Sequence, residues 1–377
     1  MIKILYVDPM SYNNLAIYDK NLLSNIKQEV LFIGNVKYKG DKLGDKMRLI
    51  FTYSNFKYDI FKSLFYIFNL LQLLLIILKE SPKVIHIQWF KLPSFDFIYI
   101  KLLKFIKPNI KIVHTAHNVL PHNSGDKYIV IYKKLYNKVD QIITHTEDSK
   151  FQIIDKFNVE PDSIKVIYHG LLELDVNYEI ANEEIAKMKS LYKSDNQLIC
   201  LNFGLISKYK GVDLLLDAWH ESTILNNTND YNLIIVGKGN TNMLNKSSNN
   251  VFIDNRYVTN EELYAYINIS DIIVLPYRQI SQSGVLLTAL FYKKPIIVNE
   301  IGGLTDPLTI ANVGWSFKSN CHESLKLLLE KVVNDETLKL VNHDNESWNT
   351  IHKRYSWESI GSDTLNIYKK LLRDTYA

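Results

Sequence analysis

Short apolar runs rich in β-branched residues alternate with amphipathic helical patterns from one end of the chain to the other. Apolar runs of roughly four to eight residues bounded by polar turns are typical of buried strands, and apolar residues three and four apart are typical of helices. The runs that we interpret as strands form two series. The first series is Ile2–Val7, Val30–Ile33, Val84–Gln88, Lys111–Thr115, Gln141–His145 and Lys165–Tyr168; the second is Leu198–Phe203, Asn232–Val236, Val251–Ile253, Ile272–Leu275, Pro295–Val298 and Gly314–Phe317.

Continuous apolar strands separated by helices imply parallel sheets that are covered by helices on both faces. The first series ends at His169–Gly170, and we place the interdomain connection in the charged, helix-prone stretch from Glu173 to Asp195. The pattern predicts an α/β protein with two Rossmann-like, doubly wound domains, residues 1–172 and 173–355, and a terminal helix in 356–377. Such sheets bind ligands at the carboxyl ends of their strands, so two sheets face to face would form a cleft.

One uncharged stretch, Ser63–Leu78, allows more than one interpretation. It is shorter than the roughly 18–20 residues that span a bilayer. Four polar positions lie within one arc of about 100° on a helical wheel, which leaves a very wide apolar face. These positions are Lys62, Asn69, Gln72 and Lys79. Three interpretations stay open: a mostly buried helix, which the following Pro82 and strand favour, a helix on a membrane surface, and a transmembrane span.

Composition narrows the classes of function. A chain of 377 residues exceeds what one core usually supports, and 47% hydrophobic with 22% charged residues is typical of globular domains. The two cysteines, Cys200 and Cys321, exclude a disulfide framework and offer no metal-ligand spacing. A net charge of +4 and a pI of about 8.6 fit polyphosphate ligands or an anionic lipid surface, but not nucleic acid. The N-terminus enters a strand directly without a signal pattern, so we expect a cytoplasmic protein.

The turn after the first strand of the second series, Phe203–Gly211, carries the strongest local signal. Gly204 at a strand end lets the backbone approach a ligand, and amides at the start of the next helix attract phosphate. Lys208 and Lys210 add positive charge. The turn matches neither a Walker A motif nor Gly-x-Gly-x-x-Gly, so a plain turn with solvated lysines stays an alternative.

A second turn follows the strand that ends at Leu275. The polar segment after Pro276 leads to Ser283, which has the sequence of an N-cap, and Gly284 in the first helical turn clears space for a phosphate on free amides. A capped helix with nothing bound is the alternative.

Three histidines cluster after a strand of the first series. His114, His117 and His122 lie within nine residues, where a parallel strand delivers its ligand-facing loop. We expect at least one of them in the cleft. Their spacing is not that of a zinc site, and no metal is predicted.

Taken together, these motifs resemble the retaining glycosyltransferases of family 4, enzymes of the GT-B fold that build bacterial capsules, O-antigens and exopolysaccharides. The resemblance covers essentially the whole chain, and the terminal helix with Trp357 and Tyr368 would cross back onto the N-terminal domain. The matching segments are Val84–Trp89, Thr115–Asn118, Val166–Gly170, Gly204–Gly211, Val236–Gly239, Ser270–Pro276 and Lys294–Val298 with Gly302-Gly303.

The resemblance implies roles for individual residues. The C-terminal domain would bind the nucleotide-sugar donor, with Lys210 on the diphosphate, and His117 would reach the donor sugar; these two are the predicted catalytic residues. Diphosphate contacts would come from Gly204, Lys208, Lys210, Arg278, Ser283, Gly284 and Val285. Sugar contacts would come from His117, Asn118 and Gln282, and nucleoside contacts from Arg256, Tyr257, Val258, Thr288 and Glu262, with Glu261 as its alternative. On the acceptor side, the resemblance points to Asp8, Tyr12, Asn13, Gln88 and Trp89.

The sequence departs from the family at two places. The family commonly has two glutamates seven residues apart across the phosphate turn, and the matching residues here are Ile280 and Thr288. Gln282 and Thr288 are the nearest substitutes. The arginine that commonly follows the turn glycine is Leu205, and we hypothesise that Lys208 or Arg278 restores that charge.

The predicted function is transfer of a hexose-type sugar from a UDP or GDP donor to a glycan or lipid-linked acceptor. The resemblance implies retention of configuration by front-face attack, without a metal or other cofactor, where the leaving phosphate takes the acceptor proton and basic residues stabilise it. The basic pI and Ser63–Leu78 suggest a peripheral position on the inner membrane surface. The alternatives are a non-catalytic nucleotide-sugar- or glycan-binding protein, which the missing glutamates favour, and an epimerase on the same fold.

Overall fold

The structure is a computed structural model that describes residues 4–40, 46–121, 125–193, 197–226, 228–240, 248–280, 282–334 and 336–373. The chain folds into two compact units. The first is Met1–Gly170 together with Ser356–Ala377, and the second is Leu171–Tyr355. Each unit contains one sheet of parallel strands with helices on both faces, which confirms the predicted pair of Rossmann-like domains.

The first unit is built around a seven-stranded sheet in the order β3-β2-β1-β4-β5-β6-β7. Its strands are β1 (Ile4–Val7), β2 (Val30–Asn35), β3 (Met47–Phe51), β4 (Val84–Ile87), β5 (Lys111–Ala116), β6 (Gln141–Thr144) and β7 (Ile164–Val166). Its helices are α1 (Ala16–Asn25), α2 (Asp59–Glu80), α3 (Pro93–Ile106), α4 (Ile129–Tyr136), α5 (Glu147–Phe157) and α14 (Trp357–Arg373). The strand order reverses between β1 and β4, and such a switch point opens a crevice at the carboxyl ends of the strands.

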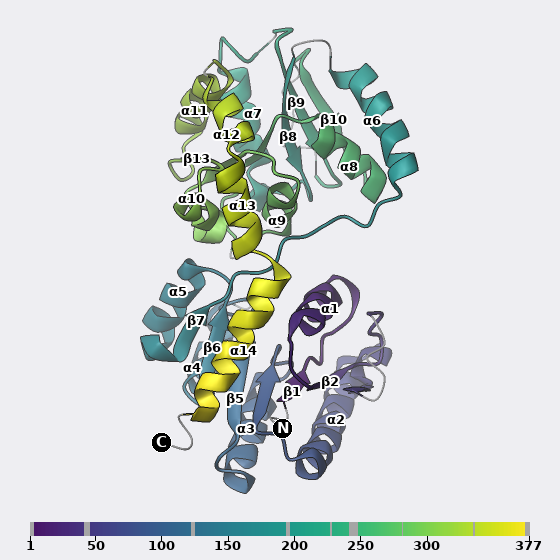
Figure 1. Ribbon diagram of the computed structural model, residues 1–377, viewed down its shortest axis with the longest axis vertical. Coiled ribbons are helices and arrows are strands. Elements are labelled where there is room, and N and C mark those ends of the chain that lie inside the picture. The colour runs from purple at the N-terminus through teal and green to yellow at the C-terminus, as the bar shows by residue number, and fades with distance from the viewer. Residues whose placement is uncertain are drawn as a thin grey trace. The chain divides into compact units, whose positions relative to one another are not determined.

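Two cores hold this unit together, one on each face of the sheet. Helices α2 to α5 cover one face, and their apolar residues pack with strand residues such as Ile85 and Ile112. On the other face, α1 and the C-terminal α14 pack together over residues such as Ile4 and Val113 (Figure 1). A Cβ on Gly170 would lie 2.2 Å from the ring of Trp357, so only glycine leaves room for that ring.

The second unit is built around a six-stranded sheet in the order β10-β9-β8-β11-β12-β13, with its own reversal between β8 and β11. Its strands are β8 (Leu198–Phe203), β9 (Tyr231–Val236), β10 (Val251–Asp254), β11 (Ile272–Leu275), β12 (Ile296–Asn299) and β13 (Gly314–Phe317). Its helices are α6 (Tyr178–Tyr192), α7 (Val212–His220), α8 (Asn260–Ile269), α9 (Gly284–Phe291), α10 (Asp306–Ile310), α11 (His322–Asn334), α12 (Thr337–His343) and α13 (Asn345–Arg354).

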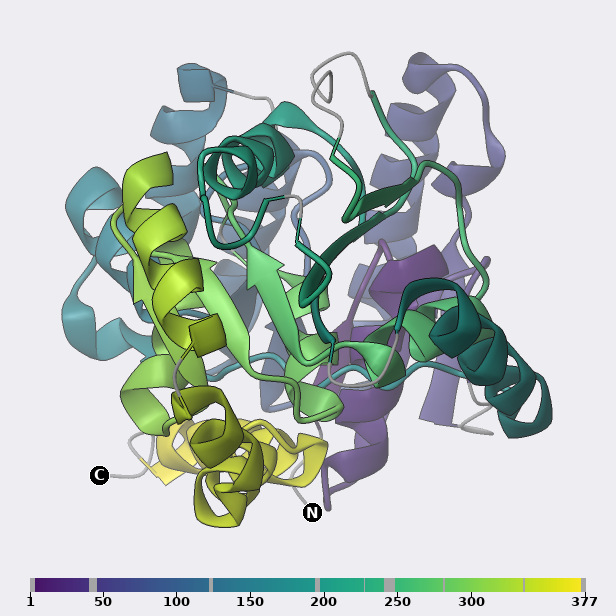
Figure 2. The same ribbon diagram turned by 90° about the horizontal axis from the view of Figure 1, so that it is seen from above.

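Helices again lie on both sides of this sheet, as Figure 2 shows. Helices α7, α11 and α12 supply one core, in which Trp219 is fully buried between the sheet and its neighbours. The stretch from 173 to 195, in which the interdomain connection was placed, contains helix α6, which packs against α8 within the second unit.

Two details of the first unit differ from the sequence prediction. Strand β3 was missed, because its residues are half-exposed at the sheet edge and include Arg48, so the apolar run is short. Helix α2 is longer than the predicted stretch, and the prediction of a mostly buried helix is wrong. It has 22 residues, and only 28% of its most apolar window is buried inside the domain. Asn69, which the helical wheel placed on the polar arc, is itself buried and contacts Thr52.

Candidate functional site

Two turns meet at the switch point of the second sheet. The turn Gly204–Gly211 follows β8, and the segment from Pro276 to Ser283 follows β11, the strand that pairs directly with β8. The amide of Arg278 donates to the carbonyl oxygen of Tyr209 at 2.7 Å and ties the two turns together. The turns that the sequence singled out separately therefore lie together at the switch point, the place where open α/β sheets have the crevice that binds ligands.

Lys210 is the buried cation of this crevice. Lys210 is the last residue of a short 3-10 helix, Lys208–Lys210, and is only 9% exposed. Its Nζ lies 3.8 Å from the centroid of the Tyr277 ring and 5.6 Å from that of Tyr209. Desolvation lowers the pKa of Lys210 from 10.5 to about 8, and no carboxylate of the described residues pairs with it. A buried ammonium that only aromatic faces support has unused capacity for an anion.

Glycines let the backbone come close on both sides of this crevice. Gly211 has φ +68°, and a Cβ there would lie 1.9 Å from the carbonyl oxygen of Pro276. Gly237, after β9, has φ +142°, and a Cβ there would lie 1.8 Å from the oxygen of Gly204. These contacts require glycine because the positive φ and the approaching backbone leave no room for a side chain.

Helix α9 begins at the edge of the same crevice. The Ser283 hydroxyl caps it by accepting from the amide of Leu286 at 3.3 Å. Gly284 is exposed and Val285 half-buried in the first turn, where amides have no partner within the helix. Gln282 is half-buried beside the cap, whereas Thr288, one turn further, is buried.

The two candidates for the missing arginine differ in the structure. Arg278 pairs with Asp213 at 2.5 Å and donates to the carbonyl oxygen of Lys208 at 2.9 Å, so its charge is already compensated. Lys208 is exposed. Of the three basic residues predicted for the diphosphate, the structure therefore leaves Lys208 and Lys210 without a carboxylate partner among the described residues.

The residues predicted for the nucleoside lie after β10. Arg256 forms a bidentate pair with Glu262, at 2.9 and 2.6 Å, and a further pair with Asp254 at 3.0 Å. Glu262 also forms a capping box with Thr259 at the start of α8, so this carboxylate is engaged in holding the helix. Tyr257 is 76% exposed, with the Nζ of Lys238 5.4 Å from its ring centroid, and offers an open aromatic face. Val258 is half-buried beside it.

The first unit has a pocket of its own at its switch point, with a volume of about 410 Å³. This volume is within the range of small-molecule sites. Gln88 and Trp89 after β4 line it together with His117 and Asn118 after β5. The pocket thus brings together four residues that the sequence assigned to the sugar or the acceptor. Lys91, which the sequence did not single out, also lines it.

The β1–α1 loop contributes Met10 and Leu15 to this pocket. The three residues of this loop that were predicted to contact the acceptor differ in their exposure. Asp8 is 1% exposed and accepts from the amide of Met10, so it points into the domain. Tyr12 is half-buried and Asn13 exposed. Desolvation holds the pKa of Asp8 and of the nearby Asp19 above their usual range, and the coupling between them raises the pKa of Asp19 further. Burial therefore favours the protonated form of both carboxyl groups, and more strongly that of Asp19.

His117 has both ring nitrogens engaged by other side chains. Its Nδ1 lies 3.1 Å from Nε2 of His145, and its Nε2 lies 3.0 Å from the side-chain amide of Gln88. The ring also stacks on Trp89, with centroids 4.7 Å apart and an interplanar angle of 12°. His114, by contrast, is buried against Phe90 and bonds to a main-chain carbonyl. His122 lies outside the described residues.

The neighbours of His117 determine its tautomer. Nδ1 of His145 donates to the carbonyl oxygen of Ile167 at 2.9 Å, so Nε2 of His145 accepts and Nδ1 of His117 donates. Burial lowers the pKa of both rings, that of His145 to about 3, so both are neutral. Nε2 of His117 then needs a donor, although the atom placed 3.0 Å from it is Oε1 of Gln88. A carbonyl at this place would require a second proton on His117 or His145, so we assign the NH₂ group of Gln88 to this position by turning the amide over.

The same chain of hydrogen bonds continues to the C-terminal helix. The amide of Gln88 lies 3.0 Å from Nε2 of His86, and Nδ1 of His86 lies 2.6 Å from the hydroxyl of Tyr368 on α14. With the Gln88 NH₂ toward His117, the Nε2–H of His86 is shared between the Gln88 carbonyl oxygen and the hydroxyl of Thr115 at 2.7 Å, and Tyr368 donates to Nδ1 of His86. Sequence reasoning missed Gln88, His86 and His145 as supports of His117, because they come from β4 and β6 whereas His117 follows β5.

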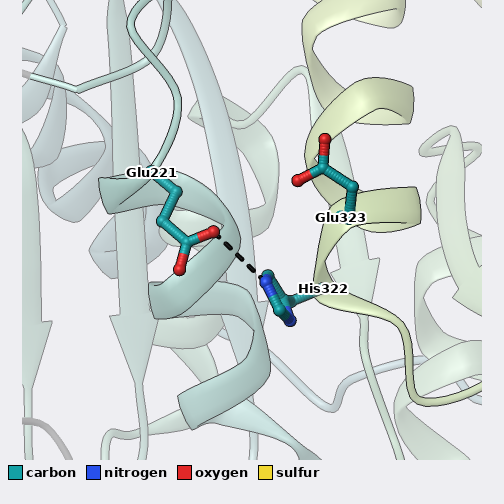
Figure 3. A group of neighbouring side chains, drawn as sticks. All are labelled: Glu221, His322 and Glu323. Atoms are coloured by element: carbon teal, nitrogen blue, oxygen red, sulfur yellow. Dashed lines mark ion pairs between the residues drawn. The ribbon is translucent and has the colours of Figure 1, made fainter.

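One group of side chains outside both crevices could offer three metal-ligand atoms. Figure 3 shows Glu221 at the end of α7 beside His322 and Glu323 at the start of α11. All three are exposed, and His322 pairs with Glu221 at 3.2 Å. Glu323 pairs with Lys326 on its own helix at 2.7 Å, so all three side chains already have partners at the surface.

Two family models match the chain, one in each unit. The model described as "Glycosyltransferase Family 4" matches residues 41–171, and the model described as "Glycosyl transferases group 1" matches residues 183–347. An uncharacterized glycosyltransferase of Methanocaldococcus jannaschii is 26% identical over 242 residues, 61% of this chain. The match spans 60% of that relative, so it covers less than two thirds of its length.

A second relative and a solved structure extend these matches. An uncharacterized 41.2 kDa protein in the cps region of Klebsiella pneumoniae is 24% identical over 54% of this chain and 56% of its own length. The crystal structure of Anabaena HepE in complex with UDP superposes with a TM-score of 0.69 at 12% identity, covering 98% of this chain and all of that one. This likeness shows the GT-B fold. With a family model on each of its two domains and this fold throughout, the chain belongs to the GT-B glycosyltransferases of family 4.

Proposed function

We propose that the chain transfers a sugar from a UDP or GDP donor to a glycan or lipid-linked acceptor, with retention of configuration and without a metal. The observation that carries the proposal is Lys210, a desolvated ammonium at the switch point, 3.8 Å above an aromatic ring and without a carboxylate partner among the described residues. A diphosphate is the ligand that best satisfies such a site, because charge-assisted hydrogen bonds to phosphate are strong in a water-poor crevice.

The same crevice supplies the other groups that a diphosphate needs. Lys208 adds a second cation, and the amides of Gly284 and Val285 lie at the start of α9, where anions are favoured. We assign Arg278 a supporting role, since its bond to Lys208 and its pair with Asp213 shape the turn. Tyr257 is the proposed face for the base, and Arg256 is held beside it by Glu262.

In the proposed reaction the bond from the anomeric carbon to the diphosphate oxygen breaks, and a bond from the acceptor oxygen to the same carbon forms. The acceptor proton passes to the leaving phosphate oxygen. Negative charge grows on the diphosphate as it leaves, so a cation that stabilises it lowers the barrier. This scheme requires no carboxylate base.

His117 stays the proposed contact to the donor sugar, with one amendment. Both of its ring nitrogens are engaged in the structure, so a hydrogen bond to a sugar requires that Gln88 or His145 gives way. We propose the pocket of about 410 Å³ as the acceptor site, with Trp89 as part of its apolar wall, and keep Tyr12 and Asn13 at its entrance. Asp8 acts by holding the loop.

We further propose a role in surface polysaccharide synthesis, at the cytoplasmic face of the cell membrane. The relative in the cps region of Klebsiella pneumoniae supports a polysaccharide pathway. The two missing glutamates favour a second candidate, a protein that binds nucleotide sugars without turnover. An epimerase finds little support, because Asp213, the carboxylate beside the diphosphate crevice, is paired with Arg278.

Incubation with a panel of UDP- and GDP-sugars, followed by NMR, tests the proposal. We expect slow release of nucleoside diphosphate from one donor, faster with the acceptor, and a product with the anomeric configuration of the donor. Inverted product would contradict retention, and an isomerised donor would indicate an epimerase. Binding without release of nucleoside diphosphate, even with lipid-linked acceptors added, would identify a non-catalytic protein.

A further inference from the structure

Helices α2 and α3 are neighbours in the first unit (Figure 1). Each of them carries a stripe of exposed apolar side chains. Large apolar side chains recur along each helix at steps of three and four residues, so each set forms one stripe. The residues are Phe61, Leu64, Phe68, Leu71, Leu75 and Leu78 on α2, and Phe95, Ile98, Leu102 and Phe105 on α3, all of them at least 40% exposed. We call them together the α2–α3 face.

The opposite side of both helices belongs to the core of the domain. On α2, Tyr66 donates to the buried carboxylate of Asp96 on α3 at 2.7 Å, and Leu73 and Ile77 pack under the sheet. Helix α2 is long and apolar enough to cross a membrane, but crossing would strip the sheet of this packing. The helix is therefore apolar on its outer side while it stays a structural part of a folded domain.

An exposed apolar surface of this extent is unusual for a protein without a partner and marks an interaction site. The charge around this surface indicates which kind of partner it binds. From Lys57 to Lys107 the sequence contains eight lysines but only three acidic residues, a net charge of +5, whereas the whole chain carries +4. Of the three acidic residues, Asp96 is buried, Glu80 pairs with Arg48 and Asp59 pairs with Lys62. Among the lysines, Lys104 pairs with Asp140 outside the segment, which leaves Lys79 and Lys101 as exposed lysines on the two helices. The positive charge of the chain is thus concentrated in the segment that carries the apolar stripes.

Exposed apolar stripes together with a positive charge favour a lipid surface over a second copy of the chain as the partner. Two copies that met through the α2–α3 face would bring two segments of net charge +5 together, which costs free energy. An anionic bilayer offers apolar depth to the stripes and phosphate groups to the lysines. Lys101 on α3 is exposed next to Ile98 and Leu102, as a side chain that reaches a headgroup should be.

We propose that the α2–α3 face docks the first unit on an anionic lipid bilayer, with its apolar side chains in the interface and its lysines at the lipid phosphates. Helix α3 begins at Pro93, a residue that lines the pocket of about 410 Å³, together with the half-buried Lys91. If the proposed function holds, docking brings this pocket to the surface that carries a lipid-linked acceptor. The docking itself is independent of the reaction.

Vesicle flotation with the full chain tests the proposal. We expect the protein to float with vesicles that contain anionic phosphatidylglycerol, less with pure phosphatidylcholine, and less at high salt. The double variant Leu71→Asn/Leu75→Asn should lose at least tenfold in partitioning, because both leucines, 56% and 67% exposed, would enter the interface. Lys79→Glu/Lys101→Glu, at exposed lysines of α2 and α3, should lose a similar factor on anionic vesicles only.

The matched control is Leu340→Asn, since Leu340 on α12 in the second unit is 66% exposed and lies outside the face. This variant should float like the wild type. Flotation without donor or acceptor does not depend on turnover, so failure of the proposed function leaves this test intact. Absence of the wild type from anionic vesicles would overturn the proposal. Light scattering without vesicles tests the alternative. A dimer of the wild type that dissociates in Leu71→Asn/Leu75→Asn would overturn the proposal and show that the face binds a second copy of the chain.

Discussion

Replacement of Lys210 by methionine should have opposite effects on the empty protein and on its complex with a nucleoside diphosphate. In the empty site the ammonium is desolvated, and its pKa falls from 10.5 to about 8. A shift of this size corresponds to a cost of roughly 3 kcal/mol for the charged form. Methionine has a similar length and carries no charge, so Lys210→Met should make the empty protein more stable at pH 7.

The direction with pH follows from proton linkage. The folded state binds the Lys210 proton more weakly than the unfolded state, so the destabilisation is fully present below pH 8 and disappears as the pH rises from 8 to 10.5. The difference in melting temperature between Lys210→Met and the wild type should therefore shrink over this range. A constant difference would show that the charge of Lys210 is not desolvated.

Binding of a diphosphate reverses the shift, because a nearby anion favours the charged amine. With a pKa of about 8, half of the empty sites carry the proton at pH 8, so binding should take up about half a proton. At pH 7, uptake should fall to about a tenth of a proton. Titration calorimetry with UDP or GDP, in two buffers of different ionisation enthalpy, measures this number.

The comparison with variants isolates the contribution of Lys210. Lys210→Met should lose this proton uptake and bind the diphosphate at least tenfold more weakly, since a charge-assisted hydrogen bond contributes about 1.5–3 kcal/mol. Lys208→Met is the matched control, because Lys208 is exposed in the same turn and should keep the proton uptake. Equal proton uptake in the wild type and Lys210→Met would refute the placement of the diphosphate.

Three further predictions concern stability and the histidine chain. Gly211→Ala should lower the free energy of unfolding by about 2 kcal/mol or more in thermal denaturation, because its Cβ would clash with the backbone of Pro276. Gly284→Ala is the control and should change the stability little, because a Cβ there makes only an ordinary contact. Equal effects of the two substitutions would contradict this reasoning. ¹⁵N NMR spectra should show His117 as the Nδ1–H tautomer in the wild type and in Gln88→Leu, because His145 fixes it; an Nε2–H tautomer in the wild type would contradict the assigned amide orientation. Asp8→Asn should stabilise the protein more at pH 7 than at pH 4. Burial raises the pKa of the Asp8 carboxyl group, so its ionisation destabilises the folded wild type as the pH rises. A difference in stability between variant and wild type that does not change with pH would contradict the raised pKa.

The sheets and the crevice of the second unit could be predicted because their signals are local. Continuous apolar strands, turn glycines and the Ser283 cap each lie within a few residues, and parallel order brings their ends to one edge. Strand β3 could not be recognised, because an edge strand with a half-exposed face has no continuous apolar run.

Pairings between distant residues could not be predicted in the same way. The pair of Arg278 with Asp213 and the bonds of His117 to Gln88 and His145 join residues from different strands and turns. The same limit applies to α2, since a helical wheel shows that a helix is broadly apolar but not which part of it faces the sheet. The outer stripe of α2 became visible only with the sheet in place.

The most direct test of the central claim is the rate of nucleoside diphosphate release from the cognate nucleotide sugar, in the wild type and in Lys210→Met. The account predicts measurable release by the wild type and a loss of at least tenfold in kcat in the variant, because Lys210 stabilises the charge that develops on the leaving diphosphate. Equal rates in the two proteins would contradict the account.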